Sequence, residues 1–385
     1  MTADGRAGWT STGVIARARE EAPFLVGAVT LAVFQLHGDR WLVGLTGFFI
    51  AGLIFMWLFA AAVWATFGVV RHADALAHLL GEPFGTLILT LSVIGIEVSL
   101  IASVMLTGIA SPELARDTMF AVLMIVLNGL VGAALLLGGL RHKVQDYNLQ
   151  GARAFLVVLL PLSVFALILP DFTVSTADAT FSPLQAGFFA LITILLYGVF
   201  LIMQTVRHRT FFEQPTVGDP VAESPHAPDE AHGPIRSRSY HIAMLLLTLV
   251  PIVLLSKRLA KLVDFGIVEV GAPVALGGVL IALLVLLPES MSAIAAARAN
   301  LLQRSVNLLL GSALATIGLT VPAILAISLA IGHPVTLGLD NVSVVLLVLT
   351  LVISTMTFGG ARTNVLQGAV HLVLFLAYLL LIFSP

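Results

Sequence analysis

Two glutamates stand in apolar stretches that offer a charged side chain no ordinary partner. Glu97 lies in the run Leu91–Ser99, and Glu289 lies in the run Leu286–Ser292. An ionised carboxylate in an apolar medium is strongly destabilised unless something neutralises it. No lysine or arginine lies in the apolar part of any helix that we predict. We therefore expect each acid to be neutralised by a proton or a metal cation.

Two carboxylates that meet at one place can bind protons and a cation in turn. Burial and mutual repulsion favour the protonated form, and an arriving cation supplies positive charge that displaces the protons. One Ca²⁺, two H⁺, or one Na⁺ with one H⁺ would each balance the pair. Such mutually exclusive occupancy is the coupling step of an antiporter, and it predicts that Glu97 and Glu289 form a shared cation and proton site.

Further oxygen ligands would have to surround the cation, because Ca²⁺ takes about 6–8 of them. The candidates are side chains with a hydroxyl or amide oxygen in the predicted helices: Ser92, Ser99, Asn128, Ser290, Ser292 and Ser312. For each serine the competing interpretation is a bond back to its own helix or a small packing residue.

Glu82 is a third acid, placed 15 residues before Glu97. That spacing is about 22 Å along a helix, so Glu82 cannot share the central site. We interpret it as a cap at a helix amino terminus, with a cytoplasmic entrance or gate for cations as the alternative.

The composition defines the elements that must position these acids. Of 385 residues, 59% are hydrophobic and only 10% are charged, whereas soluble domains are about 25% charged. A soluble enzyme, a disordered chain and a nucleic-acid binder are thereby excluded. The absence of cysteine excludes disulfides, thiolate metal sites and cysteine catalysis. We expect an all-α polytopic membrane protein with no cofactor, whose partners are inorganic cations, protons and lipid.

The sequence contains eleven apolar runs whose lengths approach that of a membrane span. They are residues 22–36, 41–70, 84–106, 119–140, 155–169, 186–203, 241–255, 273–287, 305–331, 342–356 and 369–383. With a cytoplasmic amino terminus, 14 of the 19 lysines and arginines fall in inner segments, which agrees with the positive-inside rule. The external basic residues are Arg40, Arg116, Lys257, Arg258 and Lys261. The carboxyl terminus is then external.

A polar stretch rich in proline and histidine divides the chain. We predict a cytoplasmic amino terminus and peripheral first helix (1–40), a first transmembrane repeat (41–206), a cytoplasmic linker (207–239) and a second repeat (240–385). Because each half has five helices, the halves must be inverted, as in ion-coupled transporters. Each acid lies in the second helix of its half. Glu97 is about 20 Å and Glu289 about 24 Å into a core about 30 Å thick, from opposite sides.

Several runs resemble the bacterial calcium/proton antiporters of the ChaA type, within the calcium/cation antiporter superfamily. They are Leu80–Leu100, Leu287–Ser290, Asn307–Pro322 and Gly360–Gly368, in order and at similar spacing. The resemblance implies a peripheral helix plus two inverted five-helix repeats in the inner membrane. It also implies exchange of Ca²⁺, and of Na⁺ or K⁺, for H⁺, with Glu97 and Glu289 matching the acids of the two repeats.

One departure from the superfamily bears on the ion. The superfamily places Gly-Asn shortly before each acid, whereas this chain has Val93-Ile94 and Val285-Leu286. Two amide ligands are therefore missing, which leaves open a monovalent Na⁺/H⁺ or K⁺/H⁺ antiporter with little Ca²⁺ transport. An intramembrane protease or lipid transferase lacks its motifs here, because the chain has neither G-x-S-x-G nor H-E-x-x-H. A passive channel is a further alternative, and the oligomeric state stays open.

Three other features are interpreted structurally. The lone histidines His241 and His371 lie near or in helices, and we expect neighbouring groups to satisfy them. Arg362, Thr363 and Asn364 follow a Gly-Gly pair and are interpreted as a loop anchor rather than a ligand set.

Overall fold

The computed structural model describes residues 19–43, 47–80, 84–105, 113–176, 179–215, 236–332, 335–360 and 362–384. The described chain is helical except for connecting turns and two short strands, and it forms two compact units. Unit 1 contains residues 1–92 and 223–262, and unit 2 contains residues 93–222 and 263–385. The unit boundaries fall within helices α4 and α9.

Unit 1 is built from three long helices that approach one another at small residues. They are α2 (Ala22–Val43), α3 (Phe48–Leu80) and the first part of α9 (Arg238–Val270). A Cβ atom at Gly68 of α3 would lie 2.8 Å from Pro23 and 3.4 Å from Thr248 of α9. Close approach at small residues is the usual way that helices pack in membranes. Gly68 therefore allows α2 and α9 to meet α3 at the same level.

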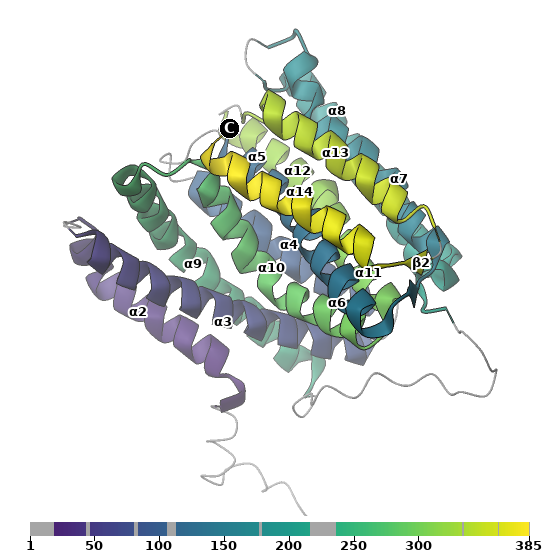
Figure 1. Cartoon of the computed structure of the whole chain (residues 1–385). Coiled ribbons are helices and arrows are strands. Elements are labelled where there is room, and N and C mark those ends of the chain that lie inside the picture. Colours follow the sequence, from purple (N-terminus) through teal and green to yellow (C-terminus); the bar gives the residue numbers. More distant parts are fainter. Residues whose placement is uncertain are drawn as a thin grey trace, which may run out of the picture. The chain divides into compact units, whose positions relative to one another are not determined.

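Unit 2 holds the remaining helices, which are shown in Figure 1. From the first half of the chain come α4 (Phe84–Met105), α5 (Leu114–Met124), η1 (Ile125–Leu130), α6 (Val131–His142), α7 (Leu149–Leu167), η2 (Leu169–Phe172), α8 (Pro183–Ile202), η3 (Met203–Arg207) and η4 (Arg209–Phe212). From the second half come α10 (Ala275–Arg298), α11 (Leu302–Ala315), η5 (Thr316–Thr320), α12 (Val321–Ile331), α13 (Asn341–Thr357) and α14 (Val365–Phe383).

The continuous helix at residues 114–142 forms the centre of unit 2. In its most apolar window 78% of the residues are buried, against 17% for α14. Helices α10 and α14 pack along it. The outer face of α8 exposes large apolar side chains, among them Leu184, Leu195 and Ile202. Exposed apolar side chains on a long helix are suited to lipid, so the chain is an integral membrane protein.

Two π-helical turns interrupt long helices at corresponding places in the two halves. η1 lies inside the helix at 114–142, and η5 lies inside the helix at 302–331. A π turn holds one residue more than an α turn and is frequent at functional sites. Asn128 lies within η1, whereas Asn307 lies in α11, nine residues before η5.

The eleven predicted spans correspond to helices in the described part of the chain. Seven helices are long and apolar enough to cross a membrane, and a bent pair adds an eighth. Three shorter apolar helices, Ala22–Gly38, Leu91–Ala102 and Asn341–Thr357, match the other predicted spans. The prediction of an all-α polytopic fold is confirmed. Several predicted spans were shorter than the helices that the structure shows. For example, the span predicted at residues 155–169 belongs to α7, which begins at Leu149.

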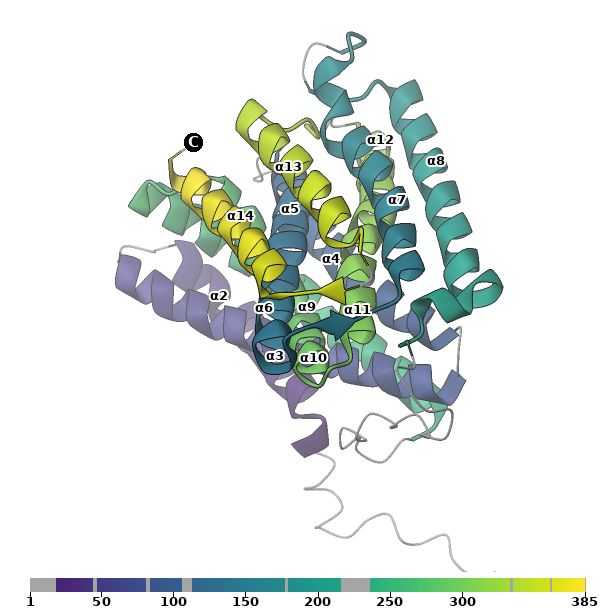
Figure 2. The same ribbon diagram turned by 45° about the vertical axis from the view of Figure 1, so that its right-hand side comes forward.

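Short strands join the two halves of the chain inside unit 2. β1 (Gln145–Asp146) pairs antiparallel with β2 (Arg362–Thr363), as Figure 2 shows. Arg362 Nε donates a hydrogen bond to Asp146 Oδ1 at 2.8 Å. Asn364 caps α14 by accepting hydrogen bonds from its first backbone N–H groups. These contacts agree with the interpretation of Arg362–Asn364 as a loop anchor.

The predicted linker has structured ends. Arg209–Phe212 forms a 3₁₀ turn in which Phe212 is buried and contacts the rings of Phe155 and Phe200. The apolar pair Phe211-Phe212 explains why the turn packs into unit 2, since the rest of the range 207–239 is polar. Residues 216–235 lie outside the described residues.

Candidate functional site

Glu97 of α4 is buried inside unit 2, with 1% of its surface exposed. Its Oε2 atom accepts a hydrogen bond of 2.9 Å from the Thr316 hydroxyl in η5. The Thr320 hydroxyl, one turn farther along, approaches the same carboxyl group. Its Oε1 atom is buried and has no hydrogen-bond partner among the described residues. A proton or a cation on Oε1 would satisfy this oxygen.

Glu289 lies at the bend of α10. The segments Ala275–Leu287 and Glu289–Arg298 meet at an angle of 58°. Pro288 stands at the break in the sequence, and proline removes a backbone donor from the helix. Glu289 is therefore the first residue beyond the break, where helical backbone hydrogen bonding is interrupted. This agrees with the expectation that the helix bends beside the acid.

The two acids are close enough for their charges to interact within unit 2. The described residues form no ion pair with Glu97, because each salt bridge found there joins other side chains. The same residues contain no cluster of three or more histidine, aspartate or glutamate side chains that could hold a metal ion. A cation at this site would bind two carboxylates and otherwise hydroxyl, backbone or water oxygens.

The predicted supporting ligands lie in different surroundings. Ser290 donates a hydrogen bond of 2.6 Å to the Leu286 carbonyl, as a serine that bonds back to its own helix does. The Asn128 amide is engaged by Thr350 and His371. The other four stay candidates: Ser92 and Ser99 on α4, Ser292 on α10 and Ser312 on α11, all buried or half-buried. Glu82 lies outside the described residues.

Thr316 and Thr320 are site residues that the sequence reasoning missed. They lie four residues apart in an apolar run that follows the Asn307–Ala315 stretch. Two hydroxyls at that spacing share a helix face, so a usable signal was present. It was missed because the candidate ligands were serines and one asparagine, and threonines were not included.

A chain of buried polar side chains ties α13 and α14 to η1. Asn128 Nδ2 donates to Thr350 Oγ1 at 2.8 Å, and His371 Nδ1 lies 3.2 Å from Asn128 Oδ1. Thr357 Oγ1 lies 2.9 Å from His371 Nε2. Because the amide oxygen only accepts, His371 donates from Nδ1 and accepts at Nε2 from the Thr357 hydroxyl. The expectation that neighbours satisfy His371 is confirmed.

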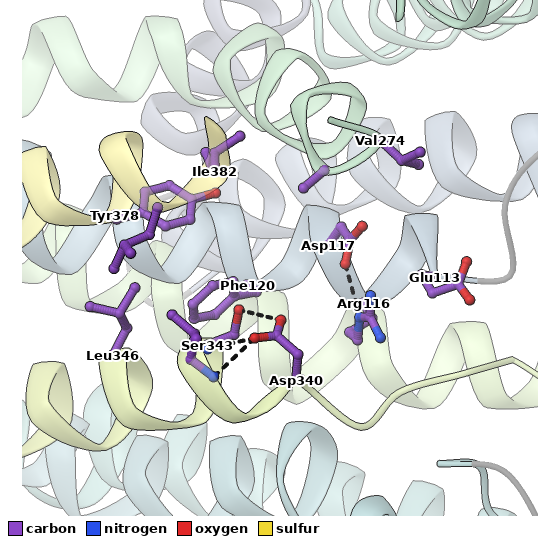
Figure 3. Close-up of a pocket in the computed structure, with 13 residues that line it drawn as sticks. Glu113, Arg116, Asp117, Phe120, Val274, Asp340, Ser343, Leu346, Tyr378 and Ile382 are labelled. Carbon is purple, nitrogen blue, oxygen red and sulfur yellow. Dashed lines mark hydrogen bonds and ion pairs between the residues drawn. The ribbon is translucent and has the colours of Figure 1, made fainter. Parts of the chain in front are cut away.

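An acidic cavity of about 480 Å³ opens elsewhere in unit 2, as Figure 3 shows. Its polar lining includes Glu113, Arg116, Asp117 and Asp340. Arg116 Nε donates to Asp117 Oδ1 at 2.8 Å, and Arg116 Nη1 donates to the Gly338 carbonyl at 2.9 Å. Neither Glu97 nor Glu289 lines this cavity, so it is a different place from the buried acid pair.

Comparison with known proteins identifies the family. The model of the sodium/calcium exchanger protein family matches residues 50–206 and 240–384, which include both acids. The chain belongs to this family. The sodium-potassium/proton antiporter ChaA of Escherichia coli (strain K12) is 43% identical over 322 residues, covering 83% of this chain and 86% of that protein. A protein of Sinorhizobium fredii named as an ionic transporter is 44% identical over 323 residues, with the same coverage.

Solved structures of exchangers share the fold. Native YfkE superposes with a TM-score of 0.71 at 16% identity and covers 94% of this chain and 100% of its own. The H⁺/Ca²⁺ exchanger CAX gives a TM-score of 0.64 at 17% identity, covering 94% and 88%. The chain therefore shares the all-helical fold of these solved exchangers.

Proposed function

We propose that this protein is a secondary active antiporter that exchanges Ca²⁺, and Na⁺ or K⁺, for H⁺. One observation carries the proposal: the Glu97 carboxyl is buried beside Glu289, without an ion-pair partner in the described chain. A buried carboxyl without an ion-pair partner needs a mobile positive charge, either a proton or a cation. The relationship to the E. coli sodium-potassium/proton antiporter supports the same activity.

The side chains around Glu97 suit both charge states. When Glu97 is ionised, the Thr316 hydroxyl donates to Oε2 and stabilises the charge that attracts the cation. When the carboxyl is protonated, its own O–H can donate and the hydroxyl can accept, because threonine serves in either role. The same contact can therefore persist while the charge changes, which lowers the cost of alternating between H⁺ and cation.

A monovalent-selective antiporter, exchanging Na⁺ or K⁺ for H⁺ with little Ca²⁺ transport, is the second candidate. Ile94 and Leu286 are 6% and 2% exposed, at the places where the superfamily offers the asparagine amide oxygens. These buried apolar side chains offer the cation no ligand, and Ca²⁺ needs more oxygens than Na⁺ or K⁺ to offset its dehydration. The relative named as a sodium-potassium/proton antiporter favours this candidate too.

The two candidates separate in one vesicle experiment. Everted membrane vesicles are energised so that their lumen is acid, and acridine orange reports the pH gradient. Addition of Na⁺, K⁺ or Ca²⁺ in turn shows which cation releases protons. Dequenching by all three supports the broad exchanger, and dequenching by Na⁺ or K⁺ alone supports the monovalent one. No dequenching by any of them, from a correctly inserted protein, would remove the proposal.

We further propose that the protein lies in the bacterial inner membrane with a cytoplasmic amino terminus and an external carboxyl terminus. The basic residues of the predicted inner segments support this orientation. The range 207–239 then joins the repeats 41–206 and 240–385 on the cytoplasmic side. Because the chain has no cysteine, single cysteines at Ser237 and Ser384 test the orientation with a membrane-impermeant maleimide. Intact cells should label only Ser384→Cys.

A further inference from the structure

A second group of titratable side chains lies in unit 1, where the starts of α2 and α9 meet α3. Glu21 precedes α2, His72 belongs to α3 and His241 to the first turn of α9. His72 and His241 are 1% and 6% exposed. The Nδ1 atoms of the two imidazoles are 3.0 Å apart, and His72 Nε2 is 3.1 Å from Glu21 Oε2. The predicted satisfaction of His241 by neighbours is thus confirmed.

The contacts fix which nitrogen of each ring carries hydrogen. The backbone N–H of Arg236 donates to His241 Nε2 at 3.1 Å, so that nitrogen is bare. A neutral His241 must then carry its hydrogen on Nδ1 and donate it to His72 Nδ1. Because His72 Nδ1 accepts, a neutral His72 carries its hydrogen on Nε2 and donates it to Glu21; Arg71 Nη2 lies 3.2 Å from the same nitrogen, and its hydrogen goes to Glu21 Oε2 at 2.6 Å instead. With both rings neutral, each nitrogen has a partner along one directed chain from Arg236 to Glu21.

Fixed charges complete the surroundings of the two rings. On the α2 side, Glu21 accepts from Arg71 Nη2 and from the Tyr240 hydroxyl, both at 2.6 Å. Glu20 pairs with Arg236 at 2.6 Å, and the Arg71 side chain also donates to the Glu20 carbonyl. Two arginines balance two glutamates, so the group is neutral when the imidazoles are neutral. An added proton would leave one uncompensated positive charge.

Glu21 does not take that proton near neutral pH. Burial by itself would raise the pKa of Glu21. Hydrogen bonds from His72 and Tyr240 and the charge of Arg71 outweigh burial and lower the pKa to about 2. A proton that reaches the group must therefore bind an imidazole.

Every placement of one extra proton breaks a contact. A proton on His72 Nδ1 faces the N–H of His241 at 3.0 Å, and a proton on His241 Nε2 faces the N–H of Arg236 at 3.1 Å. Moving the His241 hydrogen from Nδ1 to Nε2 relieves the first conflict and creates the second. The arrangement therefore accepts a proton only by separating α9 from α3 or from its own preceding residue.

We propose that Glu21, His72 and His241 form a proton-binding site that releases the start of α9 when one imidazole is protonated. We call these three residues the histidine clasp. Helix α9 begins at Arg238, at the very end of the 207–239 range, and its start lies beside Arg71 and Arg236. Given the orientation in the proposed function, this end is cytoplasmic. Protons imported by exchange would bind the clasp, so it would couple exchange rate to cytoplasmic pH.

The tautomers provide a test that does not depend on transport. The protein, ¹⁵N-labelled at histidine, is reconstituted in lipid and studied by solid-state NMR, with His72→Gln and His241→Gln used to assign the two rings. At about pH 8 we expect hydrogen on Nε2 of His72 and on Nδ1 of His241, with an N–H···N contact between them. On acidification both signals should change together. An Nε2–H tautomer at His241, or two rings that titrate independently, would overturn the proposal.

Hydrogen exchange tests the release of α9. His72→Gln keeps an acceptor toward His241 and a donor toward Glu21 but cannot be protonated. The hydrogen-exchange rate of the peptide at residues 236–244 is compared between this variant and wild type at the same pH. The intrinsic chemical exchange rate, which depends on pH, is then the same for both proteins. We expect equal protection at about pH 8 and about tenfold faster exchange of wild type at about pH 5.5, one unit below the usual histidine value. Equal protection at both pH values argues against release. His37→Gln, in an exposed ring of α2, is the matched control.

A transport measurement separates this inference from the proposed function. The exchange rate of wild type should show a step with cytoplasmic pH that His72→Gln lacks and His37→Gln keeps. If wild type exchanges ions but His72→Gln retains the step, the coupling to exchange is wrong. If wild type exchanges no ion, the proposed function fails, whereas the NMR and hydrogen-exchange results still decide the clasp.

Discussion

Replacing Thr316 by valine tests the chemistry of the buried acid pair most directly. The change removes the hydroxyl that donates to Glu97 Oε2 at 2.9 Å and keeps nearly the same volume. A hydrogen bond to a charged group contributes about 1.5–3 kcal/mol. Since 1.36 kcal/mol corresponds to a tenfold change, the ionised, cation-loading form of the site should be disfavoured about 10-fold to 150-fold.

Two readouts should follow from that number in everted vesicles. The cation concentration that gives half-maximal dequenching should rise by about tenfold or more. The pH profile of exchange should move toward alkaline pH, because the protonated carboxyl releases its proton less readily when the ionised form is less stable. Thr316→Ser keeps the hydroxyl and should restore both properties.

Thr118→Val is the matched control, because its hydroxyl is buried and bonds only within its own helix, to the Leu114 carbonyl. It should leave both readouts unchanged. A Thr316→Val protein with wild-type apparent affinity and pH profile would refute the role given to this hydroxyl.

Four further predictions concern single side chains. Glu97→Gln and Glu289→Gln should each abolish exchange in vesicles while the protein stays folded by size-exclusion chromatography; normal exchange by either would contradict the acid-pair mechanism. Ser290→Ala should change the apparent cation affinity less than about threefold, since the hydroxyl bonds its own helix; loss of transport would make it a ligand. His371→Leu leaves a buried amide oxygen without its donor, which costs about 1–3 kcal/mol, and thermal unfolding in detergent should occur at lower temperature than for His371→Asn. Glu21→Gln should destabilise unit 1 at neutral pH; because folding lowers the pKa of Glu21 from 4.5 to about 2, the difference from wild type should shrink as pH falls through that interval, and a difference that grows there would contradict the assignment.

The helices and the acid pair could be predicted because both follow from solvation. A span must be apolar over a length set by the bilayer, and a carboxylate within it stands out against that background. Glu97 and Glu289 were therefore recognisable from the sequence without any contact information. The odd number of helices in each half likewise required the halves to be inverted.

Contacts between distant residues were beyond the sequence reasoning. Whether Asn128 faces the acids or His371 depends on one extra residue in a helical turn, and no composition or period reveals such a turn. His72 and His241 meet across 169 residues, and each alone resembles any buried histidine. Phe212 packs into unit 2 although its neighbours are polar, because two aromatic side chains outweigh the composition of the surrounding segment.

The π-helical turns have a consequence for how these helices tolerate change. Each residue of an α-helix advances the side-chain direction by about 100°, so a one-residue surplus rotates everything beyond it by that angle. Shortening η5 by one residue would leave an intact, equally apolar helix whose second half presents a different face. The mean hydropathy of the helix would stay almost the same, yet the side chains of Val321 and of the residues after it would point in a different direction. The length of these two turns thus decides which side chains the second half of each helix presents to its neighbours.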